Sequence, residues 1–332
     1  MDAVRELDSS RCLVFRKGMP PAPVHDVGEV SDILKETDAV VWLDLCDPTA
    51  VQIDVLHAEF GLHPLALEDA TTAHERPKAD AYPEYWVVVV HGITGTADGF
   101  VVHEMTIFAA HRFVVTVRHS PLYPLGQVEH RWLQDDNPMR HDSATLLYLL
   151  LDTIVEDYSN VADGFVRRVA EIEEVLFGGG HSPREFLQEV FSMRNDLRRF
   201  RRSIAPMREI LTSIIHSPGD IFKADEVAYY RDVRDHAVRA IDEIDAAGDA
   251  VSSALDMQFR LENQRQGDVV KQLTVIATIF LPLTFITGFF GQNFGWLVTN
   301  IASLPTFLVF GIVLEIATVA SLLLWFKVKR WL

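Results

Sequence analysis

The chain has 332 residues, which is enough for more than one domain with a sizeable core. Its 47 acidic residues outnumber its 30 basic residues, and the formal net charge is -17. This balance argues against nucleic-acid binding, because phosphates are neutralised by clustered lysine and arginine, but it is compatible with attracting cations. Cys12 and Cys46 lack metal-ligand spacing, so we expect reduced, buried thiols in a cytosolic domain. The acidic first twelve residues have no apolar core, so we expect no secretory signal.

Residues 1–140 alternate short β-rich runs with turns and helical segments, which predicts an α/β domain. Four runs rich in valine, isoleucine and aromatic residues are expected to be strands, namely Ala39–Leu45, Tyr85–Ile93, Met105–Ala110 and Arg112–His119. Helical spacing over 48–61 and 63–72 predicts two helices that each open near a proline. No strand is followed by a GxxxxGK or GxGxxG sequence, so the domain is not expected to bind a nucleotide through a glycine-rich loop.

Residues 141–218 are expected to form an antiparallel pair of cytosolic helices. The first, 143–177, keeps a 3.6-residue apolar period, with charged residues on the other face. After a glycine-rich turn, Ser182–Glu185 matches a capping box that opens the second helix. That helix covers 184–216, and Pro206 is expected to kink it.

The segment from Gly219 to Leu281 contains no proline and is dominated by helix-forming residues. As one helix it would be on the order of 95 Å long, at about 1.5 Å per residue. A helix of that length needs partners, so the sequence predicts an oligomeric bundle. We assign 219–272 to this stalk helix.

Two apolar runs follow, and each is long enough to cross a bilayer. Residues 273–290 carry no charge, and residues 304–326 carry one, Glu315. The connecting loop, 291–303, has no lysine or arginine, whereas the tail, 327–332, is basic. The excess of positive charge on cytoplasmic segments therefore predicts that both termini are cytoplasmic. We expect the membrane to be the plasma membrane of a prokaryote.

The first apolar run ends in the triad Gly291-Gln292-Asn293. The last carbonyls of a helix are unsatisfied and partially negative, and here they would face the outside. Several copies around an axis would present a ring of carbonyl and amide oxygens. Such a ring suits a hydrated divalent cation, because Mg²⁺ gives up its water reluctantly and can be recognised through its water shell.

Seven segments in this order resemble the CorA family of magnesium channels and transporters. They are Trp42–Thr49, Gly61–Asp69, Glu75–Val90, Leu197–Leu211, Tyr229–Arg239, Val269–Phe294 and the tail 327–332. The resemblance covers nearly the whole chain. It implies an α+β cytosolic domain, long stalk helices and a two-helix transmembrane hairpin, assembled as a homopentameric funnel in the lipid bilayer.

The resemblance also implies an ion pathway along the first span. Gly291, Gln292 and Asn293 would form the selectivity filter, with Gln292 in place of the family's usual methionine. The other pore-lining residues implied are Thr284, Gly288, Leu281 and, further down the stalk, Asp256. Val270 and Leu273 correspond to the hydrophobic gate, where an apolar neck blocks ions by dewetting.

A regulatory metal site is implied by the same resemblance. Asp232 corresponds to a carboxylate that binds intracellular Mg²⁺ between subunits, with Asp98 as the nearest candidate partner. Bound Mg²⁺ would hold the gate shut by coupling the cytosolic site to the pore. Glu315 has two interpretations, a hydrogen bond to a neighbouring helix or a role in proton coupling.

Three functions remain open at this point. The first is a Mg²⁺ channel closed by internal Mg²⁺, and the second is a ZntB-like transporter of Zn²⁺, Co²⁺ or Ni²⁺ with proton coupling. The pore offers no cysteine or histidine, which favours magnesium. The third is a membrane-anchored regulatory or scaffold protein without transport. An enzyme is not expected: His103–Ile107 lacks the second histidine of a zinc protease, and His63, beside Glu68 and Asp69, is interpreted as packing and capping a helix.

Overall fold

The computed structural model describes most of the chain. The described residues are 10–16, 19, 21–24, 30–36, 38–72, 76–97, 99–121, 123–133, 142–178, 183–216, 226–300 and 303–331. They form two compact units, Met1–Ala254 and Leu255–Leu332. Each unit is considered by itself below, although one helix, α8 (Val227–Phe290), contributes residues to both.

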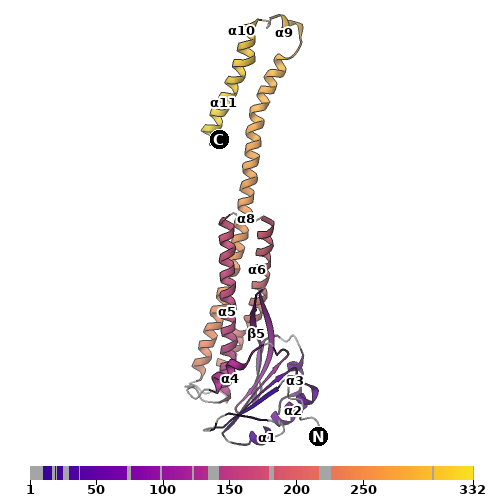
Figure 1. Ribbon diagram of the computed structural model, residues 1–332, viewed down its shortest axis with the longest axis vertical. Helices are drawn as coiled ribbons and strands as arrows, with labels where there is room; N and C mark the ends of the chain where they lie inside the picture. The colour runs from indigo at the N-terminus through magenta and orange to yellow at the C-terminus, as the bar shows by residue number, and fades with distance from the viewer. Residues whose placement is uncertain are drawn as a thin grey trace. The chain divides into compact units, whose positions relative to one another are not determined.

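The first unit contains a seven-stranded mixed sheet (Figure 1). Its strand order is β2-β1-β3-β7-β6-β5-β4. The strands are β1 (Ser10–Arg16), β2 (Ala22–Pro23), β3 (Ala39–Cys46), β4 (Lys78–Ala81), β5 (Tyr85–Thr96), β6 (Gly99–Ala110) and β7 (Phe113–Arg118). Strands β3 and β7 pair in parallel, and the other neighbouring strands pair antiparallel. The four predicted strands are confirmed in β3, β5, β6 and β7.

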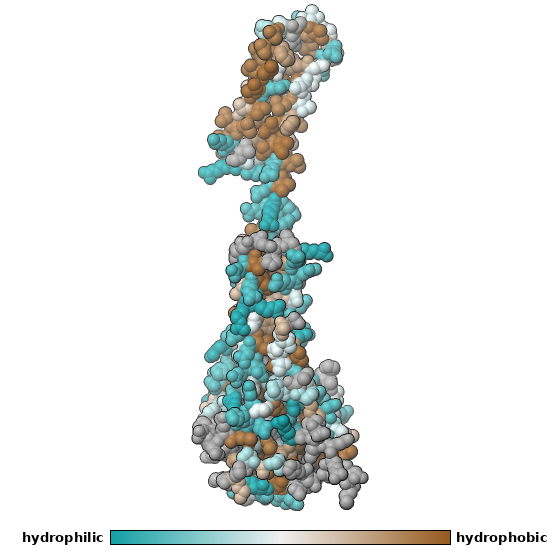
Figure 2. All heavy atoms as spheres, in the orientation of Figure 1, coloured by the Kyte–Doolittle hydropathy of each residue, from teal (hydrophilic) through white to brown (hydrophobic). Residues whose placement is uncertain are grey.

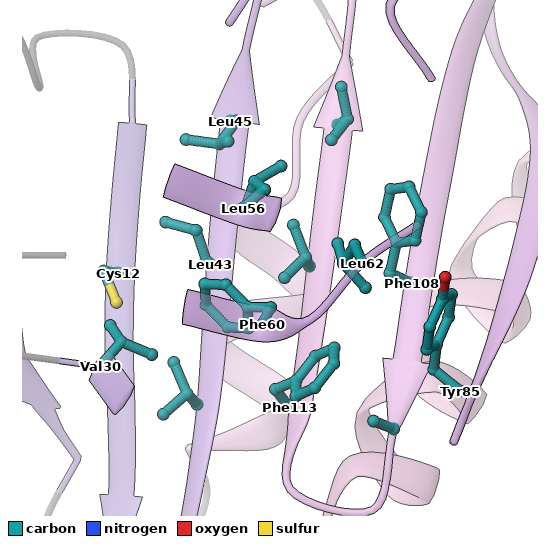
Figure 3. Packing of buried hydrophobic residues seen from close by; sticks show 14 of the residues in the cluster. Cys12, Val30, Leu43, Leu45, Leu56, Phe60, Leu62, Tyr85, Phe108 and Phe113 are labelled. Atoms are coloured by element: carbon teal, nitrogen blue, oxygen red, sulfur yellow. The ribbon is translucent and has the colours of Figure 1, made fainter. Parts of the chain in front are cut away.

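Three short helices pack on one face of the sheet: α1 (Val30–Ile33), α2 (Ala50–Phe60) and α3 (Pro64–Thr71). Figure 3 shows Leu43 and Leu45 of β3 facing Leu56 and Phe60 of α2, because alternate strand residues point to the same side. Both cysteines are buried thiols, as expected, and burial raises the pKa of the Cys12 thiol to about 12.

The caps of α2 and α3 explain where these helices begin. Thr49 and Gln52 form a capping box at the start of α2, which ends at Gly61 in the left-handed region with φ 67°. At the start of α3, His63 Nδ1 accepts a 3.2 Å hydrogen bond from the backbone N–H of Leu65. The interpretation of His63 as a capping residue is therefore confirmed.

Long helices complete the first unit: α5 (Ser143–Gly178), α6 (Pro183–Ile204), α7 (Pro206–His216) and the first part of α8, with α4 (Gly126–Trp132) beside them. Pro206 begins a new helix instead of kinking one, since it has no N–H to donate to the preceding turn. The predicted capping residue Ser182 lies outside the described residues.

Aromatic residues join these helices to the sheet and to one another. Rings of Phe100 in β6, Phe165 in α5 and Phe200 in α6 have centroids 5.1 to 6.0 Å apart. Tyr158 in α5 donates a 2.5 Å hydrogen bond to the carbonyl of His91 in β5. Tyr230 in α8 donates one of 2.6 Å to the carbonyl of Ala144 in α5. Helices and sheet therefore share one core.

The second unit contains the later part of α8 and the segments that follow it. At 64 residues, α8 is about 96 Å long, so the chain from Val227 to the end of the first apolar run forms one helix, while residues 219–225 of the predicted stalk lie outside the described residues. It is followed by α9 (Gly295–Asn300), α10 (Leu304–Phe307), the π-helical segment η2 (Leu308–Val313) and α11 (Leu314–Val328). Apolar side chains dominate the surface of these segments (Figure 2).

Candidate ion pathway and regulatory face

Two helical segments of the second unit are long and apolar enough to cross a membrane, the end of α8 and Leu304–Val328. Within one chain, almost none of their apolar windows is buried. A core helix of a water-soluble domain would be mostly buried, so these segments have the exposure expected of helices surrounded by lipid or by other subunits.

The two spans lie side by side along their length (Figure 1). Near the turn that follows α8, the rings of Phe290 and Phe310 have centroids 5.9 Å apart. At the opposite end, Lys271 Nζ donates a 3.3 Å hydrogen bond to the carbonyl of Arg330. Contacts at both ends fix which face of α8 the second span covers.

The opposite face of α8 carries the residues predicted to line the pore. The covered face, with reduced exposure, is formed by Val275, Ile279, Pro282, Leu283, Ile286 and Phe290. The exposed residues Val270, Leu273, Ala277, Leu281, Thr284 and Gly288 recur every three or four positions. At about 100° per residue, the two sets lie on opposite sides of the helix. The predicted gate and pore residues therefore share one exposed stripe.

Thr284 gives this stripe a hydrogen-bond acceptor. Its hydroxyl donates to the carbonyl of Phe280, four residues earlier, at 2.8 Å. Because the proton is used within the helix, the oxygen presents its lone pairs outward. Such an oxygen can accept a hydrogen bond from the water shell of a cation. Further down α8, Asp256 is also exposed.

The turn after α8 brings the three predicted filter residues together at its end. The N–H of Gly291 donates to the carbonyl of Thr287 at 2.8 Å, and the N–H of Gln292 reaches the carbonyl of Phe289 at 3.4 Å. A Cβ at position 291 would lie 2.9 Å from the carbonyl oxygen of Thr287, closer than real Cβ contacts come. The backbone here requires glycine, while Gln292 and Asn293 are exposed.

Asp232 lies on an exposed face of α8 in the first unit. Its carboxylate is 4.0 Å from His236 Nε2, one helical turn later. His236 lines a cavity of about 380 Å³ together with Asp152 and Glu156 of α5. Desolvation raises the pKa of nearby Tyr148, and the carboxylates of Asp152 and Asp232 raise it further.

These acidic residues do not form a complete metal site in one chain. No group of three or more histidine, cysteine or carboxylate side chains within the described ranges has the geometry to hold a metal ion. Asp98, the predicted partner of Asp232, lies outside the described residues. A divalent cation at Asp232 would therefore need ligands from a second subunit or from water.

Two features of the site were missed by sequence reasoning. Asp152 and Glu156 of α5 converge with His236 of α8, and their only sequence signal is the i,i+4 spacing within each helix. Glu315 on α11 lines a cavity shared with the filter residues Gln292 and Asn293. Both depend on the packing of helices that are far apart in the chain.

Comparison with known proteins identifies the family. Residues 37–330 match the model of the family described as CorA-like Mg²⁺ transporter protein. The chain belongs to the CorA family. It is a divalent metal ion transporter rather than an enzyme.

Relatives of this CorA family protein match it over most of their length. The Bacillus subtilis protein YfjQ is 30% identical over 87% of this chain and 89% of its own length. The cobalt/magnesium transport protein CorA of Thermotoga maritima is 28% identical over 96% of this chain and 99% of its own. The zinc transport protein ZntB of Klebsiella pneumoniae is 23% identical over 91% and 90%, respectively.

A solved structure has the same fold. The complete structure of the CorA magnesium transporter from Methanocaldococcus jannaschii matches with a TM-score of 0.79 and 19% identity, covering 98% of this chain and 99% of that one. The predicted architecture is therefore confirmed, with a soluble α/β domain, a long helix and two C-terminal apolar helices.

Proposed function

We propose that this protein is a Mg²⁺ channel of the plasma membrane, assembled as a homopentamer with both termini in the cytoplasm. The observation that supports it best is the exposed stripe of α8, which carries Val270 and Leu273 at one end and Thr284 and Gly288 at the other. The stripe leads to the triad that begins at Gly291. In a ring of five chains, this stripe faces the axis.

Recognition of the ion takes place at the outer turn through its water shell. The backbone carbonyl of Gly291 and the amide oxygen of Asn293 accept hydrogen bonds from the water around Mg²⁺. Neutral acceptors suit this ion because stripping its water is costly. Gln292 adds a further donor and acceptor at the rim, beside the oxygen atoms that select the ion.

Closure takes place at the apolar neck formed by Val270 and Leu273. Their side chains are about two-thirds exposed in a single chain, at 62% and 65%, so five copies bring ten apolar groups to the axis. An apolar constriction of this kind excludes water and ions until the helices tilt apart.

Intracellular Mg²⁺ holds this neck closed from a site that includes Asp232. The side chain of Asp232 is 67% exposed and is free to meet a neighbouring subunit. The adjacent cavity is lined by Asp152, Glu156, His236 and Arg239, and Arg131 pairs with Asp152 at 2.7 Å, so the charges of the cavity are partly balanced within the chain. When the site empties, the exposed Asp232 carboxylate repels the acidic surface of the neighbouring subunit, and the neck loosens.

The alternative is a proton-coupled transporter of Zn²⁺, Co²⁺ or Ni²⁺. It is favoured by Gln292 in the filter and by the similarity to a zinc transport protein reported above. The stripe offers oxygen acceptors and no histidine or cysteine, and this chemistry favours magnesium over the softer ions.

Flux in liposomes tests these functions. The full-length protein is reconstituted, and Mg²⁺ and Zn²⁺ uptake are compared with and without a pH gradient. We expect Mg²⁺ uptake that does not depend on the pH gradient. In vesicles that enclose the first unit of the protein, Mg²⁺ loaded inside should suppress this uptake. Zn²⁺ uptake that follows the gradient, with no Mg²⁺ uptake, supports the alternative. No uptake of either ion would support a scaffold without transport.

A further inference from the structure

The second unit contains a cavity of about 540 Å³ beside the outer turn. Its walls come from the last turns of α8, the Gly291–Asn293 turn, α9 and the beginning of the second span. Most of the wall is apolar and includes Phe290, Phe307, Phe310, Ile286, Leu297 and Val298. Pockets that bind small molecules are of this kind, with volumes of roughly 300–1,000 Å³, mostly apolar walls and few polar groups.

Glu315 is the one ionisable side chain in the wall of this cavity. Among the described residues, none forms a hydrogen bond or ion pair with its carboxylate. The two hydroxyl groups in the wall are engaged elsewhere. Thr287 donates to the carbonyl of Leu283 at 2.9 Å, and Thr306 pairs with the hydroxyl of Ser303 at 2.6 Å.

No basic residue lies near enough to neutralise Glu315. Between Leu273 and Trp331, the other ionisable side chains in the sequence are Lys327, Lys329 and Arg330. Lys327 follows Glu315 by twelve residues, which corresponds to about 18 Å along the helix. A carboxylate within a span is costly unless it is paired or protonated, so Glu315 either holds a proton or pairs with a cation from outside the chain.

The chemistry of the wall favours an organic cation over a metal ion. Glu315 is the one charged oxygen ligand in this wall, and the other polar side chains there are the neutral amides of Gln292 and Asn293 and the hydroxyls of Thr287 and Thr306, so a dehydrated divalent cation would find too few anionic ligands. An alkylammonium group is attracted both by a carboxylate and by aromatic faces. The tilted rings of Phe290 and Phe310, with centroids 5.9 Å apart, supply such faces on opposite spans.

We propose that this cavity binds an amphiphilic organic monocation, with its ammonium group beside Glu315 and its apolar body among the phenylalanine rings. This cavity lies on the face of α8 that the second span covers, and its wall includes the Gly291–Asn293 turn, so a bound cation would sit beside the mouth of the proposed ion pathway. It goes beyond the proposed function, because binding at equilibrium requires neither transport nor a particular transported ion.

The test uses benzyltributylammonium, whose charge does not change with pH. Its binding to the full-length protein in lipid nanodiscs is measured by equilibrium dialysis, and binding to empty nanodiscs is subtracted. We expect saturable binding of one molecule per chain, weakened about tenfold or more in Glu315→Gln, a factor that corresponds to about 1.4 kcal/mol. The matched control is Glu262→Gln, which removes the other glutamate of the second unit from the exposed surface of α8 and should leave the affinity unchanged.

A second variant tests the cavity without changing its charge. Val298→Phe places a larger side chain in the cavity wall and should also weaken binding. This variant therefore tests the binding site even if Glu315→Gln does not assemble. Equal affinity in the wild type and in both variants would overturn the proposal. So would binding no greater than that of empty nanodiscs, which would leave lipid or a proton as the partner of Glu315. Either result can be obtained whether or not the protein transports Mg²⁺.

Discussion

Arg118 and Asp44 form a buried, bidentate ion pair across the parallel strands β7 and β3. Arg118 Nη2 lies 2.5 Å from one carboxylate oxygen of Asp44, and Nε donates to the other at 2.9 Å. Thr116 donates to the same carboxylate at 2.7 Å, and Arg118 Nη1 donates to the carbonyl of Tyr123. The pair therefore ties the only parallel contact of the described sheet to the segment that leads into α4.

Removal of Asp44 should destabilise the first unit strongly. Asp44→Ala leaves a guanidinium buried without its partner, and such a loss costs about 3–5 kcal/mol. We expect a clear fall in the thermal midpoint of the detergent-solubilised protein, followed by tryptophan fluorescence. Asp32→Ala breaks the exposed pair with Lys35 and should leave the midpoint unchanged. Equal midpoints for wild type and Asp44→Ala would show that the buried pair contributes no stability.

The sequence predicts the parts of the fold that have strong local patterns. Strands β3 and β5 to β7 are long apolar runs, whereas β4, with the sequence KADA, has no β-forming residue and exists only because it pairs with β5. The helix α9 lies in a segment expected to be a loop. Its six residues are too few for a periodic pattern to indicate a helix.

In the candidate site, too, some features can be predicted from the sequence and others depend on how helices pack. The family resemblance supplies the register of Thr284, Gly288 and the filter, and in the structure Thr284 and Gly288 occupy exposed positions of α8. The cavity beside Asp232 and the one beside Glu315 depend on which faces of separate helices meet. Nothing in a single helix specifies that meeting, so these two cavities could not be predicted from local sequence.

Asn293→Ala should lower Mg²⁺ flux by about tenfold or more. A hydrogen bond to a charged partner is worth about 1.5–3 kcal/mol, and the side-chain amide oxygen would be lost from every subunit at once. Asn300→Ala is the control, because Asn300 lies in the same loop but donates to the carbonyl of Trp296 at 2.9 Å. Flux through proteoliposomes is the measurement. If the two alanine variants transport equally well, the triad acts only as a turn.

Leu273→Ser should make the closed channel leaky. A hydroxyl group in each subunit hydrates the apolar neck, so dewetting no longer blocks ions when internal Mg²⁺ is high. The comparison is Ile276→Ser, since Ile276 is 55% exposed but lies about 60° around α8 from Leu273, away from the stripe. We expect residual Mg²⁺ flux at saturating internal Mg²⁺ for Leu273→Ser alone. If Leu273→Ser shows no Mg²⁺ flux at saturating internal Mg²⁺, the gate lies at other residues.

Asp232→Asn should weaken closure by internal Mg²⁺. The substitution removes a charge from the proposed site between subunits, so higher Mg²⁺ concentrations should be needed for half-maximal inhibition of flux, by about tenfold. Asp235→Asn is matched in chemistry and position, but Asp235 pairs with Arg234 at 2.9 Å instead of facing His236. An inhibition curve identical to that of the wild type in Asp232→Asn would remove this residue from the regulatory site.

Asp157 should make the stability of the protein depend on pH. Desolvation raises the pKa of Asp157 above its usual value of 3.8 and outweighs the lowering effect of the hydrogen bond that Tyr123 donates at 2.8 Å. Because the folded state favours the protonated carboxyl, the stabilising contribution is complete below about pH 3.8 and is lost as pH rises through the raised pKa. The ionised carboxylate of Asp157 therefore destabilises the folded state at neutral pH.

Asp157→Asn should remove this destabilisation and still provide an oxygen that can accept the hydrogen bond from Tyr123. We expect its thermal midpoint to exceed that of the wild type at pH 7, and the difference should shrink as the pH is lowered toward 4. Asp163→Asn, at an exposed position of the same helix, should show no such trend. A difference for Asp157→Asn that grows on acidification would mean that the ionised form is the one the fold prefers, and the sign of the linkage would be reversed.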